Sequence, residues 1–333
     1  MLKNKENKET LNQIGEREIL NRLKKFMDIG QIDDDTSVID TNQQKLIINT
    51  DVLVEKVHFS EETTFPENIG WKAIAANVSD LISSGSEKII GITVGLITPP
   101  DTEWCWVNGV YKGMQEALEK FGGKLLGGDC SQGKQKILAI TAVGSLGPLR
   151  LHRSNAQPGD LLVTSGPHGL SRLGLALLQS EEIPDKNLLT ENLKKQSIKA
   201  HQTPSPPIEA LRHLLHCKPP KIPWRAAGTD SSDGFLDSLS NISSSSNCSI
   251  IIDTNQIPKA KDWPEGNNWD KWCLNGGEDY EMVLTLPPSW AKEWIRLVPS
   301  GQIVGEITKG PPNLLWKNGE EINIKDYTNF THF

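Results

Sequence analysis

The order of strand-like and helix-like segments in the first 150 residues constrains the fold more than any other feature of this sequence. Apolar residues at helical spacing predict helices over 68–85, with Ile74, Val78, Leu81 and Ile82 facing inward, and from about 103 to 121. Stretches rich in β-branched and apolar residues predict strands around these helices, at 45–54, 89–97, 124–129 and 136–146. Gly147 and Pro148 then end this βαβαββ series. A first domain is therefore expected to close near residue 150.

The rest of the chain predicts a second domain, because 333 residues exceed what one hydrophobic core usually serves. Turn residues separate further apolar stretches, which predict strands at 248–253, at 278–287 and after the Pro-Gly turn of 157–166. They also predict a helix over 169–180 and a turn that leads into a helix over 229–242. The polar, proline-rich stretch 181–224 is expected to form helices joined by exposed connections. A surface helix is predicted from Thr10 to Phe26. The expected fold class is α+β, with mixed elements in two domains, 1–150 and 151–333.

Composition and charge exclude several classes of protein. The net charge is -7 and no basic cluster is visible, which argues against a nucleic acid partner. The longest apolar runs, such as IIGITVGLI (89–97), are too short to span a bilayer, and the polar N-terminal stretch lacks the apolar core of a signal peptide. The five cysteines lie far apart and form no zinc motif, so reduced, buried thiols in a cytoplasmic protein are expected.

Two glycine motifs suggest phosphate binding, and they differ in strength. GDCSQGK (128–134) matches the first seven positions of a P-loop, but Gln135 replaces the Ser or Thr and a strand follows. No helix N-terminus is then available to receive a phosphate, so a P-loop is rejected. SGPHGLSRLG (165–174) does precede a helix, and either an anion at its start or a tight glycine turn fits this motif.

Aspartates near the ends of predicted strands carry the strongest chemical signal. Asp80 lies on the helix over 68–85, and five others lie at strand ends or turns, mostly beside Gly, Ser or Thr: Asp34, Asp51, Asp129, Asp230 and Asp233. A single one would be explained as a helix cap or a turn residue. Six together would repel one another unless a cation is present, and Mg²⁺ is the cation that joins carboxylates to substrate phosphates. The sequence therefore predicts phosphoryl transfer.

Motifs that run in order over nearly the whole chain extend this interpretation. They include DDDTSVI, NTDVLVEKVHF, GWKAIAANVSD, GGDCSQG, DSSDGFLDSL and GGEDYEMVLT. With these motifs the chain resembles the thiamine-monophosphate kinase family of the PurM-like superfamily of ATP-dependent enzymes. The resemblance implies phosphorylation of thiamine monophosphate to thiamine diphosphate by direct in-line transfer from ATP, with several Mg²⁺ ions. It also implies a homodimer that pairs through the N-terminal sheets.

The resemblance implies roles for individual residues, without a single general base. Metal ligands would come from the aspartate motifs and the strand beside them: Asp34, Asn49, Thr50, Asp51, Asp80, Asp129, Asp230 and Asp233. ATP contacts would come from Tyr111, Gly128, Asp129, Arg153 and Ser232. Thiamine monophosphate would contact His58, Glu278 and Phe330.

Each of these roles has an alternative that the sequence leaves open. The alternatives are a core histidine for His58, a surface ion pair for Arg153, a strand cap for Glu278 and a core residue for Tyr111. Asp33 stands where the family usually has glycine. The functional alternatives are another ATP-dependent enzyme of the superfamily, or a nucleotide-binding regulator without catalysis on the same fold.

Overall fold

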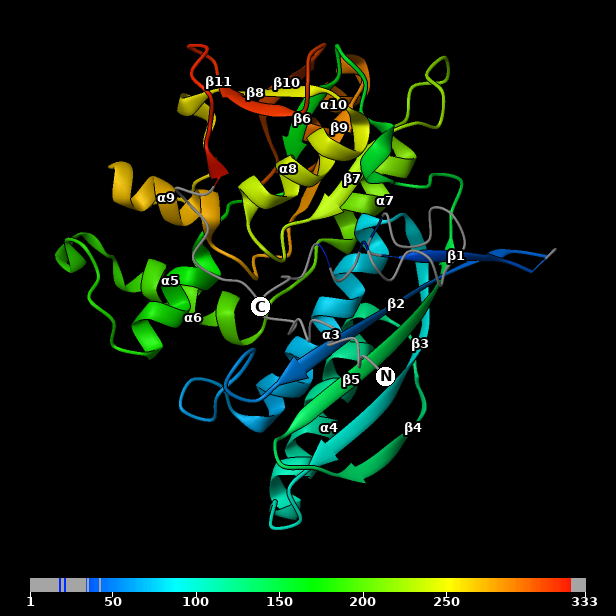
Figure 1. Cartoon of the computed structure of the whole chain (residues 1–333), viewed down its shortest axis with the longest axis vertical. Helices are drawn as coiled ribbons and strands as arrows, with labels where there is room; N and C mark the ends of the chain where they lie inside the picture. The colour runs from blue at the N-terminus through cyan, green and yellow to red at the C-terminus, as the bar shows by residue number, and fades with distance from the viewer. Residues whose placement is uncertain (1–17, 19–20, 22–33, 35, 42, 325–333) are drawn as a thin grey trace, which may run out of the picture.

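The computed structural model describes Glu18, Asn21, Asp34 and residues 36–41 and 43–324 (Figure 1). Within that part of the chain, eleven strands form two mixed sheets and eight α-helices pack around them, so the α+β class is confirmed. The predicted helix over 10–26 falls almost entirely outside the described residues, and Phe330 lies outside them as well. None of the helices in the described ranges has the length and apolar character needed to cross a membrane.

The first sheet has the strand order β1-β2-β5-β3-β4. Its strands are β1 (Ser37–Asp40), β2 (Lys45–Val54), β3 (Ser86–Thr98), β4 (Leu125–Gln132) and β5 (Ile137–Leu146). Neighbouring strands run antiparallel except β3 and β4, which α4 (Trp104–Phe121) connects as a parallel crossover. The predicted βαβαββ order is confirmed, and β2 has the predicted bounds.

Helix α3 (Pro66–Ser83) packs against one face of this sheet and against α4 (Figure 1). Ile74, Val78, Leu81 and Ile82 are all buried, as their helical spacing predicted. The helix stops before Gly85, whose φ is 98°. A side chain at Gly85 would also come within 2.1 Å of the Leu149 carbonyl oxygen, so glycine is required there.

The opposite face of the first sheet, called the outer face below, has no helix of the described chain packed on it (Figure 1). Val52 of β2, Ala139 of β5 and Gly95 of β3 pair with one another on this face. Val52 is 46% exposed, which is high for valine, a residue that strands usually pack against another surface. The alternating positions Asn49 and Leu53 point to the helix side and are buried.

The second sheet has the order β11-β8-β10-β6-β9-β7. Its strands are β6 (Leu161–Thr164), β7 (Ala227–Asp230), β8 (Ser249–Ile252), β9 (Met282–Leu286), β10 (Gln302–Thr308) and β11 (Asn313–Trp316). The helices of this half are α5 (Leu170–Leu178), α6 (Glu191–Gln202), α7 (Ile208–His216), α8 (Phe235–Ser246), α9 (Asn267–Asn275) and α10 (Pro288–Leu297). Only β11 and β8 form a parallel pair.

Three predictions need correction, two for this half and one for the cysteines of the whole chain. The strand predicted over 278–287 begins only at Met282, because Glu278 and Tyr280 have φ of 62° and 54° and cannot continue a strand. The turn predicted before 235 contains a short strand, β7, which is fully buried beside β9. The thiols are free but not all buried, since two of the five, Cys105 and Cys130, are exposed.

One apolar core joins the two sheets at their junction. Helix α3 contacts β7 and β9 as well as β2 and β5. A single cluster of buried residues runs from Ile47 and Ile92 to Met282, Leu284 and Trp290. Side chains at this junction are therefore held by close packing from both halves. The domain bounds 1–150 and 151–333 stay a prediction.

Candidate active site

Two carboxylates, one from each half of the chain, lie at the C-terminal turn of α3. Asp80, on α3 itself, accepts a hydrogen bond at Oδ2 from Asn49 Nδ2 of β2 at 2.8 Å. The neighbouring Ser79 Oγ donates to Oδ2 of Asp230, at the end of β7, at 2.7 Å. Adjacent helix residues point about 100° apart, so α3 can face both partners at once. We call this contact between α3 and the end of β7 the seam.

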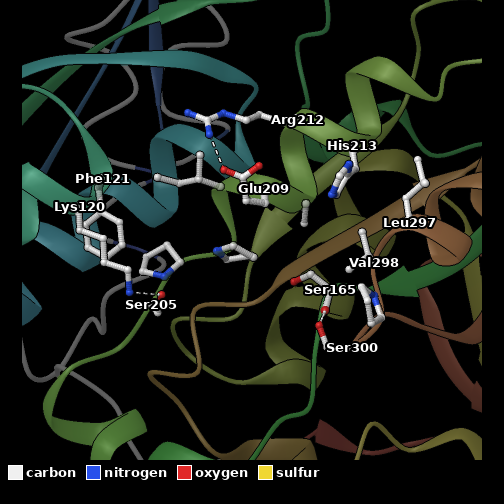
Figure 2. A pocket seen from close by; sticks show the side chains of 15 residues that line it. Lys120, Phe121, Ser165, Ser205, Glu209, Arg212, His213, Leu297, Val298 and Ser300 are labelled. Carbon is white, nitrogen blue, oxygen red and sulfur yellow. Dashed lines mark hydrogen bonds and ion pairs between the residues drawn. The ribbon is translucent and has the colours of Figure 1, made fainter.

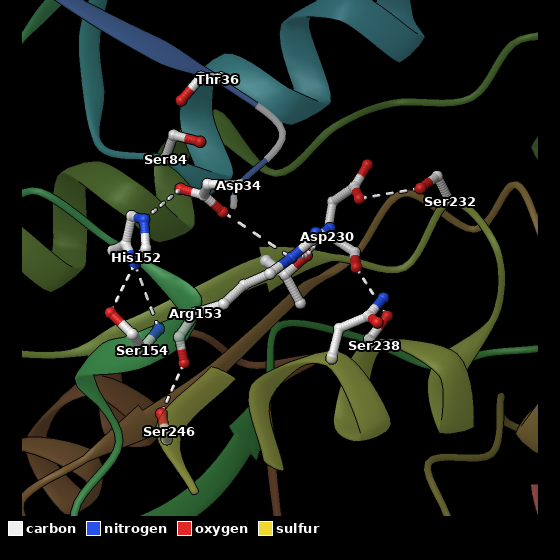
Figure 3. Close-up of polar contacts among 12 residues, drawn as sticks. Asp34, Thr36, Ser84, His152, Arg153, Ser154, Asp230, Ser232, Ser238 and Ser246 are labelled. Atoms are coloured by element: carbon white, nitrogen blue, oxygen red, sulfur yellow. Dashed lines mark hydrogen bonds and ion pairs between the residues drawn. The ribbon is translucent and has the colours of Figure 1, made fainter. Parts of the chain in front are cut away.

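Asp230 is 3% exposed and is held from several directions (Figure 3). Ser232 Oγ donates to its Oδ1 at 3.0 Å, and Ser238 Oγ donates to its main-chain carbonyl at 2.7 Å. The hydroxyl donors on both carboxylate oxygens fix the orientation of this buried group.

Tyr280 marks the place where four carboxylates converge. Burial raises the pKa of its hydroxyl well above the ordinary value, and the charges of Glu278, Asp51, Asp230 and Asp80 raise it further. Three of the predicted metal ligands, Asp51, Asp80 and Asp230, thus lie in one neighbourhood. In the arrangement seen, no three His, Cys, Asp or Glu side chains of the described ranges are close enough to enclose a metal ion.

Asn49 supplies a further oxygen at this place. Its Nδ2 donates both to Asp80 and to Asn77 Oδ1, at 2.8 and 3.1 Å. Its Oδ1 is buried and has no hydrogen-bond partner among the described residues. A buried acceptor without a donor is unfavourable, and a hard cation such as Mg²⁺ would satisfy it. Asn49 and the carboxylates around Tyr280 are therefore a donor set that fits Mg²⁺.

Asp34 lies near the seam and pairs with basic side chains (Figure 3). Its side chain is 3% exposed, and Arg150 donates to its Oδ2 at 2.6 Å. Arg153 Nε and His152 Nε2 each lie 3.8 Å from its carboxylate oxygens. Arg153 also donates to Oγ1 of Thr229, the residue before Asp230, at 3.1 and 3.2 Å. A predicted metal ligand and a predicted ATP contact, Asp34 and Arg153, are therefore neighbours.

Glu278, in the loop before β9, reaches across to the first half of the chain. Lys72 Nζ of α3 lies 2.9 Å from its carboxylate, and His201 Nδ1 of α6 lies 3.2 Å from Oε2. Burial acts to raise the pKa of Glu278, but the charge of Lys72 and the contact with His201 outweigh it and lower the pKa to about 2. The side chain makes an ion pair between the halves and does not cap β9.

The next residue, Asp279, explains the second glycine motif. Its carboxylate accepts hydrogen bonds from the N–H groups of Gly169 and Ser171, at the start of α5, at 2.6 and 3.0 Å. Burial raises the pKa of Asp279 to about 8, and these two N–H groups act in the opposite direction. The chain's own carboxyl group therefore occupies the start of α5. The glycine turn is the interpretation that holds, and an anion site there is not supported.

Asp129 lies in a different part of the first half, on β4. Two strands, β5 and β3, separate β4 from β2, so the main chains of Asp129 and Asp51 are three strand spacings, or about 14 Å, apart. Asp129 pairs with Gly95, which puts its side chain on the outer face with Val52, whereas Asp51 shares the helix side with Asn49. A single chain does not bring Asp129 beside the other carboxylates.

Tyr111 and Gly128 lie at the same edge of the sheet as Asp129. Burial raises the pKa of Tyr111, and the nearby Cys130 raises it further, so Tyr111 of α4 lies close to β4. A Cβ at Gly128 would come within 2.0 Å of the Val94 carbonyl oxygen, so glycine is required for β4 to pair with β3 here. Strand β4 runs on through Gln132, and no helix follows GDCSQGK, as predicted. Every residue of β4 is exposed.

The other predicted residues are placed as follows. Thr50 and Thr141 share a hydrogen bond between their hydroxyls, 2.9 Å long, on the outer face. His58 Nδ1 accepts a hydrogen bond from the Val54 N–H at 3.0 Å, which fixes the ring in the turn after β2. Asp233 is exposed just before α8.

Sequence reasoning missed several residues that organise this region, chiefly Lys72, Ser79, His201, Arg150 and Tyr280. Lys72 had a usable signal, since a lone charge inside the apolar stretch IGWKAIAANV is unusual. The other four had none, because their partners lie far away in the sequence. Ser79, for instance, is 151 residues from Asp230.

A cavity of about 350 Å³ lies elsewhere, between the end of α4, the start of α7 and the end of α10 (Figure 2). Lys120 and Phe121 line it from the first half, and Ser165, His213 and Ser300 line it from the second. Lys120 donates to Ser205 Oγ at 2.8 Å and lies 5.2 Å from the ring centre of Phe121. None of the predicted site residues lines this cavity.

Comparisons with known proteins agree with the motifs. The family models for AIR synthase related proteins match the chain, the N-terminal domain over 33–146 and the C-terminal domain over 157–317. The chain is 58% identical to a thiamine-monophosphate kinase of Prochlorococcus marinus over the full length of both proteins, and 38% identical to that of Synechococcus elongatus over 91% of each. A solved structure of AaThiL complexed with AMPPCP and TMP is 27% identical, covers 98% of this chain and 100% of its own, and has a TM-score of 0.84.

Proposed function

The chain belongs to the thiamine-monophosphate kinase family, and we propose on this ground that it transfers the γ-phosphoryl group of ATP to thiamine monophosphate, forming thiamine diphosphate. The observation that carries the proposal is the seam, where α3, which carries Asp80, contacts Asp230 in the neighbourhood of Asn49 and Asp51. The ligands named for AaThiL, AMPPCP and TMP, support it, because AMPPCP is an analogue of ATP.

We assign Asp51, Asp80, Asp230 and the Asn49 Oδ1 as the groups that hold Mg²⁺. The unpartnered Asn49 oxygen and the convergence of carboxylates around Tyr280 support this assignment. Mg²⁺ bound there would neutralise charge on the phosphates of the two substrates. Asp34, which accepts a hydrogen bond from Arg150, stays a predicted ligand, as do Thr50, Asp129 and Asp233.

The transfer we propose is direct and needs no single general base. The acceptor is a phosphate ester whose second pKa is about 6, so it is mostly dianionic at pH 7 and already nucleophilic. The main obstacle is repulsion between two polyanions, and in our proposal the Arg153 guanidinium, which Thr229 holds, donates to phosphate oxygens and lowers this repulsion. A single-turnover experiment with γ-labelled ATP should therefore leave no label on the protein. A trapped phospho-protein would contradict direct transfer.

We place ATP near Tyr111, Gly128, Asp129, Arg153 and Ser232, and the thiamine moiety near His58 and Glu278. Glu278 suits the second role, because the Lys72 charge keeps it ionised and a carboxylate attracts the cationic ring of thiamine. Phe330 remains a predicted contact outside the described residues.

We further propose a homodimer that pairs through the outer face. Half-exposed apolar residues on an uncovered sheet, such as Val52, favour contact with another protein surface. Pairing there would also cover Asp129, whose side chain lies on this face. A cytoplasmic location is proposed from the cysteines, because all five are free, as expected in a reducing compartment.

An ADP-release assay with three acceptors tests the function. Thiamine monophosphate, thiamine and an aminoimidazole ribonucleotide precursor are each supplied with ATP and Mg²⁺ to the purified protein. We expect turnover with thiamine monophosphate alone. Turnover with the aminoimidazole precursor would favour another enzyme of the superfamily, and ATP binding without turnover on any acceptor would favour a regulator.

A further inference from the structure

Two of the polar contacts that helix α3 makes with the second half of the chain lie on one side of the helix and involve carboxylates. Lys72 contacts Glu278, and Ser79 contacts Asp230. Seven residues make almost two turns, so the two side chains project in nearly the same direction, about 10 Å apart along the axis. The Glu278 N–H also donates to the Ser232 carbonyl at 2.7 Å, which ties together the loops that carry the two carboxylates. Helix α3 therefore sets the distance between Glu278 and Asp230.

Lys72 is buried to an unusual degree for a lysine. It is 1% exposed, and its Nζ lies 2.9 Å from both oxygens of Glu278. No other carboxylate of the described chain lies within ion-pair distance of it. An ammonium group removed from water is unfavourable unless it is paired, so Lys72 and Glu278 require each other.

His201 supports the same carboxylate from α6. It is 4% exposed, and its Nδ1 lies 3.2 Å from Glu278 Oε2 and 3.2 Å from Ser171 Oγ. Burial, together with the charge of Lys72, lowers the pKa of His201, so the ring is neutral at pH 7. A neutral ring that carries its proton on Nδ1 donates to Glu278 and fixes the rotation of the carboxylate.

Glu278 nevertheless retains an open edge. Its side chain is 30% exposed, and a carboxylate has about four acceptor positions, which Lys72 and His201 do not fill. Its backbone has a φ of 62°, a strained conformation for a residue with a side chain. Strained residues persist where surrounding contacts hold them, and they are common at ligand sites.

We propose, on the basis of the proposed function, that Lys72 and His201 are positioning residues that aim the Glu278 carboxylate at the cationic heterocycle of the acceptor. The Asp230 end of α3 then receives the phosphate of the same molecule. The helix thereby fixes the spacing of the two groups that hold the acceptor, and so favours acceptors that carry a cationic ring and a phosphate ester on one molecule. Lys72 and His201 do not touch the substrate and act through Glu278.

A double-mutant cycle on the Michaelis constants tests this role. Lys72→Met should raise KM for thiamine monophosphate about 10- to 100-fold, the usual effect of removing an orienting partner, and should leave KM for ATP nearly unchanged. Glu278→Gln should raise KM for thiamine monophosphate to a similar extent. In the Glu278→Gln background, Lys72→Met should have no further effect, because Lys72 acts only through the carboxylate. Lys120→Met, in the separate cavity, is the matched control and should leave both constants unchanged.

Two further variants keep the test decisive if Lys72→Met folds poorly. His201→Asn retains an N–H donor and should keep KM for thiamine monophosphate close to that of the unaltered protein, whereas His201→Ala should raise it. Additive effects of the Lys72 and Glu278 changes, or equal rises in KM for both substrates, would overturn the positioning role. Failure of the unaltered protein to phosphorylate thiamine monophosphate would instead overturn the proposed function, so the two failures are distinguishable.

Discussion

Aspartates of the predicted cluster lie both at the seam and on β4, at the edge of the first sheet, which we call the β4 edge. The two places differ in how far the aspartates are buried and bonded. At the seam, Asp230 is 3% exposed and has hydroxyl donors on both carboxylate oxygens. On β4 every residue is exposed, and Asp129 lies on the outer face, three strand spacings from Asp51. One chain completes the seam by its own packing. At the β4 edge, the proposed dimer would bring a second chain beside Asp129.

Replacing one aspartate from each region should have the largest effect. Asp51→Asn and Asp129→Asn should each lower kcat about 100- to 1,000-fold, because each removes a proposed ligand of the Mg²⁺ that neutralises charge on the transferring phosphoryl group. Both variants should fold normally, since loss of a carboxylate relieves repulsion in the protein without metal. Steady-state kinetics and thermal unfolding measure the two effects. Undiminished turnover would remove that aspartate from the site.

Mixing the two inactive variants would sharpen the comparison. If Asp129 acts across a dimer, a subunit carrying Asp51→Asn and one carrying Asp129→Asn together contain one intact site of two, so mixed dimers should have about half of the unaltered activity. Co-expression with two different tags and purification through both isolates these mixed dimers. Mixed dimers without activity would mean that Asp129 does not act on the partner's seam. Each variant expressed alone with both tags is the control.

A charge on the outer face should have the next largest effect. Val52→Glu should weaken dimerisation about 10- to 100-fold, because a carboxylate would be buried in an apolar contact without a partner. Turnover should fall in parallel if the β4 edge needs a second chain. Leu188→Glu, at another exposed apolar residue, is the matched control. Light scattering gives the mass, and a dimer unaffected by Val52→Glu would place the interface elsewhere.

Local pattern was enough to predict most elements but not how the site is assembled. The spacing of Ile74, Val78 and Leu81 predicted α3 and its buried side, because helix period and burial are local properties. Strand β7, AGTD, escaped prediction since it has four residues and only one that is β-branched, and it is a strand only because β9 pairs with it.

The site was predictable as a set of residues and not as an arrangement. Asp80 and Asp230 were both predicted, yet the Ser79 contact that joins α3 to the end of β7 spans 151 residues. The side of the sheet on which Asp129 lies depends on strand register, where a shift of one residue reverses the face. The lone charge in the apolar stretch around Lys72 indicated an unusual lysine, but its partner Glu278 lies 206 residues away and could not be predicted from local pattern.

A smaller effect is expected from a single hydroxyl at the seam. Ser79→Ala removes a donor from the buried Asp230 carboxylate, so the free energy of unfolding should fall by about 1–3 kcal/mol. Ser83→Ala is the matched control on the same helix, because the buried Ser83 hydroxyl has no hydrogen-bond partner among the described residues and should cost little to remove. Urea unfolding of both variants measures the difference. Equal losses would mean that the seam bond adds no stability.

The smallest effect, and the one that depends on pH, should come from Glu281 in the loop beside the seam. Burial raises the pKa of Glu281 from the ordinary 4.5 to about 7, and its bond with Ser165 Oγ only partly opposes this. The folded state therefore binds this proton more tightly than the unfolded state. The resulting stability is fully present below pH 4.5 and is lost as the pH rises through about 7. Glu281→Gln should thus match the unaltered protein at pH 5 and exceed its free energy of unfolding by about 1 kcal/mol at pH 8, after allowance for partial exposure.

Glu116→Gln, at an exposed position of α4, is the control and should leave the pH dependence unchanged. Urea unfolding at pH 5, 6.5 and 8 checks both variants, and a residual slope from Asp279, whose pKa is about 8, should remain in each. A Glu281→Gln variant with the unaltered pH dependence would show that this carboxyl group is solvated, and that the packing of the seam does not extend to the loop before β9.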